Sequence, residues 1–276
     1  MFKLYDLEMK EIPYPKGLIP LDIFVSSLNK NRYSQEIQGR NGTIDYGFDY
    51  TDRDVELSMW IKSYDTIGYR ALRNEIYKYF DKYDKFYIEE INLPSRLLLV
   101  SVDDKYIPER LQNNQRYAEV KINCKTLDQV FWVSKYKTID LHNSKFDDSG
   151  KFAFADNIND EMTDYIFRTN TFSVFNASDV DITPETMYLK IQLRDCISNG
   201  NLTIRNKTTG ETFVYFPKID FARHYTLEGM TFASATLNVL RDTNLQFISL
   251  APGKNDFEIL NCTFSAVTFD FRFYYK

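Results

Sequence analysis

Hydrophobic and polar residues alternate along much of the chain with the period of a β-strand. The clearest case closes the sequence, where the alternate positions are Val267, Phe269, Phe271, Phe273 and Tyr275. Successive side chains of a strand point to opposite faces, so this spacing predicts a strand that buries one face. The same alternation recurs in residues 53–62, 117–125, 187–193 and 202–204, and a further strand is expected at residues 96–102. These segments together predict a mainly β fold.

One stretch has the spacing of a helix instead. Within residues 65–82, the apolar positions that share one helical stripe are Leu72, Ile76, Tyr79 and Phe80. Such a stripe is typical of a helix that packs one side on a core. Asp65 precedes it and can accept a hydrogen bond from the first turn. The sequence therefore predicts one strong helix among the strands of the N-terminal half.

The chain is expected to divide near residues 128–136, where a clear strand ends and a polar stretch follows. Beyond this point the pattern consists of short strands and turns, with no convincing helix. That pattern is typical of an antiparallel sandwich. We expect an N-terminal β domain with one helix over residues 1–131 and a C-terminal β-sandwich over residues 132–276.

Composition and charge narrow the function classes. The chain has 22 Phe and 20 Tyr, which suit half-buried sheet surfaces, but only 10 Gly, which argues against glycine-rich nucleotide loops. A net charge of -5 argues against a protein that coats DNA, since that role needs clustered Lys and Arg. It is compatible with a passage through which nucleic acid slides. The N-terminus lacks a signal-peptide pattern, and no apolar run approaches the ~20 residues that span a bilayer, so we expect no membrane partner and folding in a cytoplasm.

No pattern of a catalytic or metal site accompanies the strands. His142 and His224 each lack a second ligand at metal spacing, and acid pairs arise by chance among 39 acidic residues. The cysteines Cys124, Cys196 and Cys262 are odd in number and far apart, which favours reduced, packed thiols over a disulfide. The sequence therefore predicts no catalytic residue, no metal and no cofactor.

Two features are candidates for contacts between subunits. Trp60 lies opposite the apolar side of residues 55–61, so it is either covered by the helix or docked on another subunit. The second feature is the turn Gln38-Gly39-Arg40-Asn41-Gly42, whose glycines give the loop tip freedom to conform to a neighbour. A solvated turn arginine is the simpler interpretation of Arg40.

Residues 103–116 form a polar stretch between two predicted strands. The flanking strands suggest a hairpin that projects from the domain, and an ordinary surface loop is the alternative. Tyr106 and Pro108 in this stretch complete the candidate interface, together with Trp60 and the turn residues Gly39, Arg40, Asn41 and Gly42.

Several short motifs follow one another in a set order. In the N-terminal half they are the turn at 38–42, the strand at 55–61, the helix at 65–82, the strands at 96–102 and 117–124, and Phe131-Trp132. In the C-terminal half they are the segments 202–206, 209–213, 250–255 and 269–275. In order and spacing these pieces resemble the distal tail proteins of long, flexible-tailed bacteriophages that infect Gram-positive bacteria.

The resemblance implies a structural protein of the phage tail tip. The N-terminal domains of such proteins form a hexameric ring around a channel for DNA, stacked on the tail tube protein. Their C-terminal domains, galectin-like or carbohydrate-module-like sandwiches, carry receptor-binding or other baseplate proteins, and a tail-associated tip protein docks on the opposite side. The family has no catalytic residues to transfer to this chain.

Two other function classes remain open at this point. One is a cell-wall carbohydrate-binding adhesin that acts through the C-terminal sandwich without catalysis. The other is a hydrolase that uses some of the scattered acids. Against the adhesin, residues 134–276 contain no Trp, and their Tyr and Phe residues mostly alternate inward.

Overall fold

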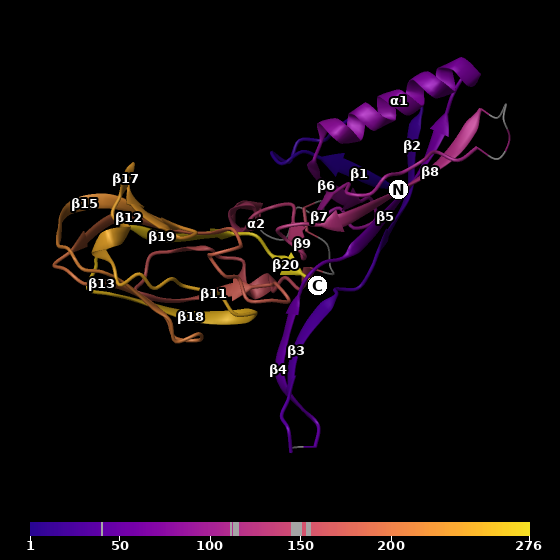
Figure 1. Ribbon diagram of the computed structural model, residues 1–276. Helices are drawn as coiled ribbons and strands as arrows, with labels where there is room; N and C mark the ends of the chain where they lie inside the picture. The colour runs from indigo at the N-terminus through magenta and orange to yellow at the C-terminus, as the bar shows by residue number, and fades with distance from the viewer. Residues whose placement is uncertain (40, 111, 113–115, 145–150, 153–155) are drawn as a thin grey trace. The chain divides into compact units, whose positions relative to one another are not determined.

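The computed structural model describes residues 1–39, 41–110, 112, 116–144, 151–152 and 156–276. They divide into two compact units, Met1–Trp132 and Val133–Lys276. Strands dominate both units, which confirms the mainly β fold predicted from the sequence (Figure 1).

The first unit is built on an antiparallel sheet with the strand order β1-β6-β7-β8-β5-β2. Its strands are β1 (Phe2–Tyr5), β2 (Leu18–Val25), β5 (Asp54–Lys62), β6 (Lys85–Glu90), β7 (Arg96–Ser101) and β8 (Tyr117–Thr126). The helix α1 (Thr66–Lys82) lies along one side of this sheet, as Figure 1 shows. Strand and helix positions both follow the predicted periodicities.

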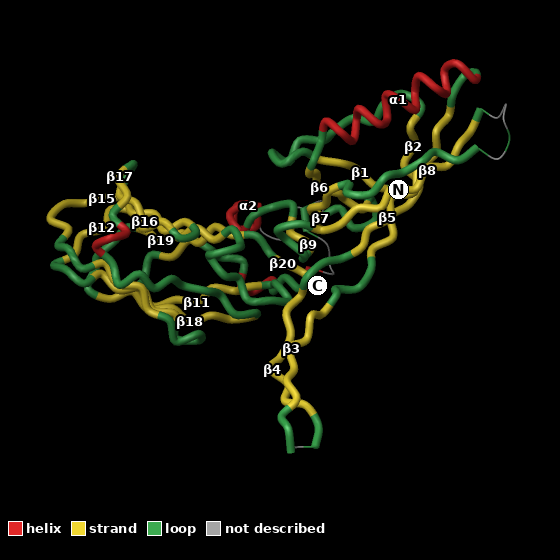
Figure 2. Tube along the Cα trace, in the orientation of Figure 1, coloured by secondary structure: helices red, strands yellow, loops and turns green. Residues whose placement is uncertain are grey.

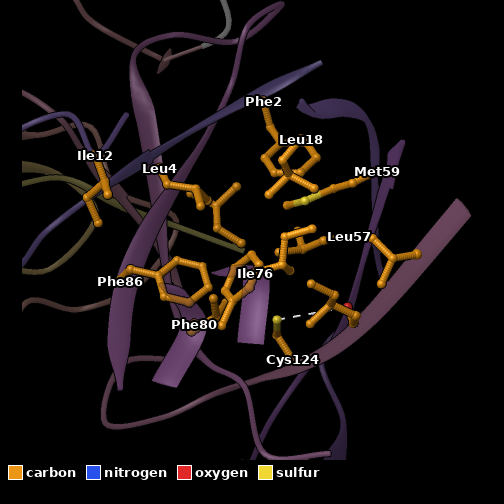
Figure 3. Packing of buried hydrophobic residues seen from close by; sticks show 14 of the residues in the cluster. Phe2, Leu4, Ile12, Leu18, Leu57, Met59, Ile76, Phe80, Phe86 and Cys124 are labelled. Carbon is orange, nitrogen blue, oxygen red and sulfur yellow. Dashed lines mark hydrogen bonds between the residues drawn. The ribbon is translucent and has the colours of Figure 1, made fainter. Parts of the chain in front are cut away.

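The core of the first unit lies between α1 and the inner face of the sheet. All four inward residues of β5, Val55, Leu57, Met59 and Ile61, are buried. They meet Leu72, Ile76 and Phe80 from the helix, together with apolar residues of the neighbouring strands (Figure 3). Cys124 of β8 belongs to the same cluster, and its thiol lies 3.9 Å from the carbonyl oxygen of Ile122. Burial raises the pKa of the Cys124 thiol well above its usual value.

Asp65 caps α1, as the sequence predicts. Its side-chain oxygen Oδ1 accepts a hydrogen bond from the backbone N–H of Gly68 at 2.6 Å, while its own backbone is extended. This bond satisfies one of the four amide groups that have no partner inside the first turn.

A two-stranded hairpin in this unit was not predicted from the sequence. Strands β3 (Lys30–Glu36) and β4 (Thr43–Tyr50) form a sheet of their own that extends away from the main sheet (Figure 2). Every residue of β3 is exposed. The interpretation of the first 35 residues as edge strands and loops rested on Pro13, Pro15 and Pro20, which interrupt short apolar runs there.

The second unit contains two antiparallel sheets. One has the order β10-β19-β12-β15-β16-β17, with β10 (Ile166–Phe167), β12 (Leu189–Ser198), β15 (Ile219–Glu228), β16 (Thr231–Ser234), β17 (Leu237–Asn238) and β19 (Ala266–Phe271). The other has the order β11-β18-β13-β14, with β11 (Thr171–Asn176), β13 (Leu202–Asn206), β14 (Thr212–Tyr215) and β18 (Gly253–Leu260). Short elements complete the unit: β9 (Trp132–Ser134), which begins at the boundary, the 3-10 turns Asp160–Met162 and Leu240–Asp242, and β20 (Tyr274–Tyr275).

Aromatic side chains fill the space between these two sheets. Phe257 of β18 lies 4.8 Å from Phe269 of β19, measured between ring centroids. Phe213 of β14 lies 4.8 Å from Phe232 of β16. Both contacts join one sheet to the other, so the unit is a β-sandwich. All five predicted inward residues at the end of the chain are buried, but the strand is divided into β19 and β20, and Thr268 and Tyr274 of the other side are buried as well.

Two expectations for the second unit are wrong. A short helix, α2 (Thr138–Ser144), lies in the half where the sequence indicated none. It is only seven residues long, and tertiary contact fixes it, since the Thr138 hydroxyl donates to the carbonyl of Phe269 at 3.0 Å and accepts from the N–H of Phe271. A helix this short carries little periodic signal of its own.

The cysteines give the second correction. Cys196 and Cys262 form a disulfide across 66 residues, and Cys124 is a free, buried thiol. Distance along the sequence suggested separate thiols. Backbone pairing of Ile197 with Thr263 brings the two cysteines together, and this pairing cannot be read from their spacing.

The helix cap gives a first test. Asp65→Ala should lower the free energy of unfolding of the first unit by about 1 kcal/mol, because a helix amide loses its partner. Urea unfolding followed by Trp fluorescence reports on this unit, since Trp60 and Trp132 both lie in it. Asp81→Ala is the matched control, because Asp81 is an exposed acid near the other end of the helix. Equal midpoints for the two variants would contradict the capping role.

The disulfide gives a second test. Oxidised protein that is unfolded without reductant and alkylated should carry one label, on Cys124, and three labels after reduction. Breaking the bond should lower the stability of the second unit by about 2–4 kcal/mol, because the unfolded chain loses the closure of a long loop. Mass spectrometry and thermal unfolding measure the two effects. Labelling of all three cysteines before reduction would refute the disulfide.

Candidate subunit interface

One face of the β2-β5-β8 part of the sheet is open. The helix α1 packs on the inner face, so the alternate residues of these strands point the other way. On β8 every outward residue is exposed: Tyr117, Glu119, Lys121, Asn123 and Lys125. We call this surface, with the outward residues of β2 and β5, the open face.

Strand register arranges the open face in rows across the three strands. Ile19, Trp60 and Glu119 stand side by side in one row. Asp22, Ser58 and Lys121 form the next row, and Phe24, Glu56 and Asn123 form the third. Aromatic and charged side chains are thus interleaved across the three rows, and of these nine residues only Ser58 is buried.

The large apolar residues of the open face are well exposed. Trp60 has 47% of its surface exposed, Tyr117 48% and Phe24 55%. The rings of Trp60 and Tyr117 lie 6.2 Å apart and form one cluster. Of the two alternatives for Trp60, cover by the helix is wrong, because α1 lies on the opposite face of the sheet.

One ion pair and one contact between a cation and an aromatic ring lie among the side chains of the open face. Lys121 Nζ lies 3.1 Å from a Glu56 carboxylate oxygen, and this hydrogen bond raises the pKa of Lys121. Lys62 Nζ lies 5.9 Å from the ring of Tyr117. Both cations are in contact with solvent, so these contacts orient side chains more than they stabilise the fold.

A shallow depression of about 570 Å³ lies at one end of the open face. Phe24, Glu56 and Asn123 of the third row line it, together with Asp54, Asp104, Lys125 and residues of the adjoining strands. Its shape and mixed lining suit a side chain from a partner protein. Among the described residues, no three His, Cys, Asp or Glu side chains converge in a way that could hold a metal ion.

The β3–β4 hairpin presents a second surface. Tyr33, Tyr46 and Phe48 are exposed along it. Lys30 Nζ lies 4.6 Å from the centroid of the Phe48 ring, and the Tyr46 hydroxyl donates to Gln35 Oε1 at 3.0 Å. A two-stranded hairpin is at best marginally stable by itself in water. Its exposed aromatic residues therefore favour a contact with another protein surface.

The predicted turn residues lie at the tip of this hairpin. Gly39 and Gly42 both have a φ of +88°, a conformation that favours glycine, and a Cβ at either would meet no atom within 4 Å. Asn41 lies between them and is exposed. Arg40 lies outside the described residues. The structure thus brings three of the four turn residues to one exposed tip, on an element separate from the strand of Trp60.

The other two candidates, Tyr106 and Pro108, lie against the helix of their own chain. Pro108 is buried, and its carbonyl oxygen accepts a hydrogen bond from the Tyr69 hydroxyl at 3.1 Å. Tyr106 is half-buried, with its ring 5.5 Å from that of Tyr77. Glu109 pairs antiparallel with Glu119 of β8, which is the arrangement of the two sides of a hairpin, and residues 111 and 113–115 between them lie outside the described residues. Tyr106 and Pro108 therefore pack within their own unit.

Sequence reasoning missed most of the aromatic residues on both surfaces. The partners of Trp60 on the open face, Ile19, Phe24 and Tyr117, come from strands far apart in the chain. Alternation did carry a signal for the hairpin, since Tyr46, Phe48 and Tyr50 recur at every second position after the Gly39–Gly42 turn.

Among the described helices, none is long and apolar enough to cross a bilayer.

Comparison with known proteins finds a match within the first unit. Residues 15–124 match the family model described as the phage tail protein RIFT-related domain. The matched residues contain α1, the β3–β4 hairpin and most of the open face. No curated protein matches the chain.

Solved structures extend the likeness to both units. The chain is similar to the Dit protein (gp 19.1) of phage SPP1, with a TM-score of 0.68 and 10% identity over 99% of each chain. That protein is described as a paradigm of the hub adsorption apparatus in phages that infect Gram-positive bacteria. Structures of the phage P2 baseplate, activated with Ca and with Sr, are 11% identical, with lower TM-scores of 0.46 and 0.47. They cover 99% and 98% of this chain and 97% of their own.

The two comparisons confirm the resemblance to siphophage distal tail proteins that the sequence indicated. The fold of this chain is that of the SPP1 Dit protein.

The position of Trp60 gives a third test. Trp60→Ala should change the free energy of unfolding of dilute, monomeric protein by less than about 1 kcal/mol, because an exposed ring loses little on truncation. Leu57→Ala, on the inner face of the same strand, should cost about 2–5 kcal/mol. Urea unfolding measures both values. A cost for Trp60→Ala that equals that for Leu57→Ala would show that the open face is covered within the monomer.

Proposed function

We propose that this protein is the distal tail, or baseplate hub, protein of a siphophage. In this role it is a structural, non-enzymatic component of the virion tail tip, made in the host cytoplasm. The observation that carries the proposal is the likeness of fold to the SPP1 Dit protein along the whole of both chains. The match of residues 15–124 to the phage tail family model supports the same role from the sequence.

The first unit is proposed to form a hexameric ring around a channel. Closing a ring by repeated head-to-tail contacts requires each subunit to offer two different, complementary surfaces. The open face with Trp60 and the hairpin with Gly39, Asn41 and Gly42 are two such surfaces on separate elements. Their exposed Trp and Tyr residues are of the types that contribute most to binding energy at interfaces.

The hub is proposed to join the tail tube protein to the receptor-binding and tail-tip proteins. The second unit, a sandwich proposed to be galectin-like, carries the receptor-binding or other baseplate components. DNA passes through the channel without stable binding, and the net charge of -5 supports this because an acidic wall repels the DNA backbone.

A carbohydrate-binding adhesin is the alternative that the sequence left open. It assigns a role to the second unit alone and gives none to the open face or to the hairpin of the first unit. It is therefore the weaker account of the whole chain.

A fourth test addresses the ring. Purified protein at high concentration should form a six-fold ring in negative-stain images, with about six times the 32.6 kDa mass of one chain by mass photometry. Trp60→Glu and Tyr46→Glu should each weaken assembly by about 100-fold or more, because each places a charge in a desolvated contact.

Leu7→Glu is the matched control for these variants. Leu7 is 59% exposed and follows β1, which lies at the opposite edge of the sheet from β2, so its variant should assemble normally. Protein that stays a single chain at all concentrations would count against self-assembly. Rings that form equally well with glutamate at position 60 or 46 would remove the proposed surfaces.

A further inference from the structure

Two cysteines of the second unit lie on segments that backbone hydrogen bonds hold together. Cys196 belongs to β12, and Cys262 lies in the loop between β18 and β19. The residues that follow them, Ile197 and Thr263, form a bridge in which each N–H donates to the carbonyl oxygen of the other, at 2.9 and 3.0 Å. These bonds involve no sulfur atom, so they align the two cysteines independently of the disulfide.

Side-chain hydrogen bonds join the same two segments. The Ser198 hydroxyl donates to the carbonyl oxygen of Asn261 at 2.6 Å, and Asn261 Nδ2 donates to the carbonyl oxygen of Asn201 at 3.0 Å. Reaction between groups that are already oriented avoids most of the entropy cost of bringing them together. The second unit can therefore fold with both thiols reduced and close the disulfide afterwards.

The two cysteines differ in their access to solvent. Cys196 has 0% of its surface exposed and Cys262 has 7%. Within the described part of the chain, Cys262 lines a groove of about 410 Å³ and Cys196 does not. The Cys262 sulfur lies 3.3 Å from the carbonyl oxygen of Thr263, which lines the same groove. Of the two sulfur atoms, that of Cys262 is the one that a small reagent meets first.

The proposed function places these cysteines in two environments in turn. A hub protein made in the host cytoplasm folds where small thiols keep cysteines reduced, whereas a virion acts outside the cell, where disulfides persist. The time at which the bond closes, as inferred below, rests on this proposed function. The order in which the two sulfur atoms react does not.

We propose that Cys196 and Cys262 are a site of oxidation by small disulfides, with Cys262 as the first thiol to react, and that the bond closes after the protein leaves the cell. The Cys262 thiolate attacks one sulfur of a small disulfide such as oxidised glutathione. A mixed disulfide forms at Cys262, the S–S bond of the reagent breaks, and one glutathione leaves as its thiolate.

The second step closes the internal bond. The Cys196 thiolate attacks the Cys262 sulfur and displaces the second glutathione as its thiolate. The two cysteine protons pass to the two released thiolates, so the cysteine pair is oxidised by two electrons and the reagent is reduced to two thiols. The closed bond joins residues 66 positions apart and stabilises the second unit only after release, because it restricts the unfolded chain.

A fifth test follows the reaction of the full, purified chain with oxidised glutathione after reduction and removal of the reductant under nitrogen. The unmodified protein should form the internal disulfide. Cys196→Ser should accumulate a glutathione adduct on Cys262, because the second step is blocked. Cys262→Ser should form an adduct on Cys196 at least about tenfold more slowly, because that thiol is enclosed. Peptide mapping by mass spectrometry measures both rates.

Cys124→Ser is the matched control, since Cys124 is a buried, free thiol of the first unit. It should oxidise at the rate of the unmodified protein. Thermal unfolding confirms that each variant is folded, and alanine replaces serine at position 196 or 262 where the serine variant is not.

A second measurement addresses the time of closure. Cells that produce the protein are quenched with acid, and the denatured protein is labelled with N-ethylmaleimide. All three cysteines should take the label. The same protein, incubated with oxidised glutathione after cell lysis, should take the label on Cys124 alone.

Each outcome decides one part of the proposal. Faster adduct formation on Cys262 than on Cys196, with three labelled cysteines in the cell, supports both parts. Equal rates for the two serine variants overturn the order of reaction, and a bond already closed in quenched cells overturns late closure. An unmodified protein that remains reduced overturns the site itself. Ring assembly is measured separately, so its failure changes none of these results.

Discussion

Contact between α1 and the inner faces of β5 and β8 holds the first unit together. Leu72 and Ile76 of the helix belong to one buried cluster with Leu57 of β5. Because the side-chain period of a strand is two, burial of Leu57 forces its neighbour Ser58 and then Trp60 toward the opposite side. A register shift of one residue would exchange the two faces. The helix contact therefore decides which residues the open face presents.

The same packing leaves two surfaces of the first unit exposed. The open face has no layer over it, and the β3–β4 hairpin extends with both strands solvated. Neither feature stabilises the isolated chain, and exposed Trp and Tyr residues on both are of the kind that bind proteins. The proposed ring requires such surfaces, because each subunit must offer complementary contacts to its neighbours.

The second unit differs from the first in how its sheets are covered. Aromatic contacts such as those of Phe257 with Phe269 bury its two sheets against each other, so its core is complete within the chain. Burial of this core therefore does not depend on the loops at the end of the sandwich. The bond between Cys196 and Cys262 and the left-handed residue Asn201 hold two of them in place. A complete core beneath paired loops suits a bond that closes after folding.

Local patterns in the sequence determined the mainly β fold, the α1 helix with its Asp65 cap, the inward side of β5 and the exposed side of Trp60. Each depends on neighbours within a few residues, and strand or helix periodicity reports such relations directly. Tertiary structure alone decided the rows of the open face, the burial of Pro108, the seven-residue helix at Thr138–Ser144 and the pairing of Cys196 with Cys262. These features join segments far apart in the chain, and the order of residues along one segment contains no record of which distant segment will lie beside it.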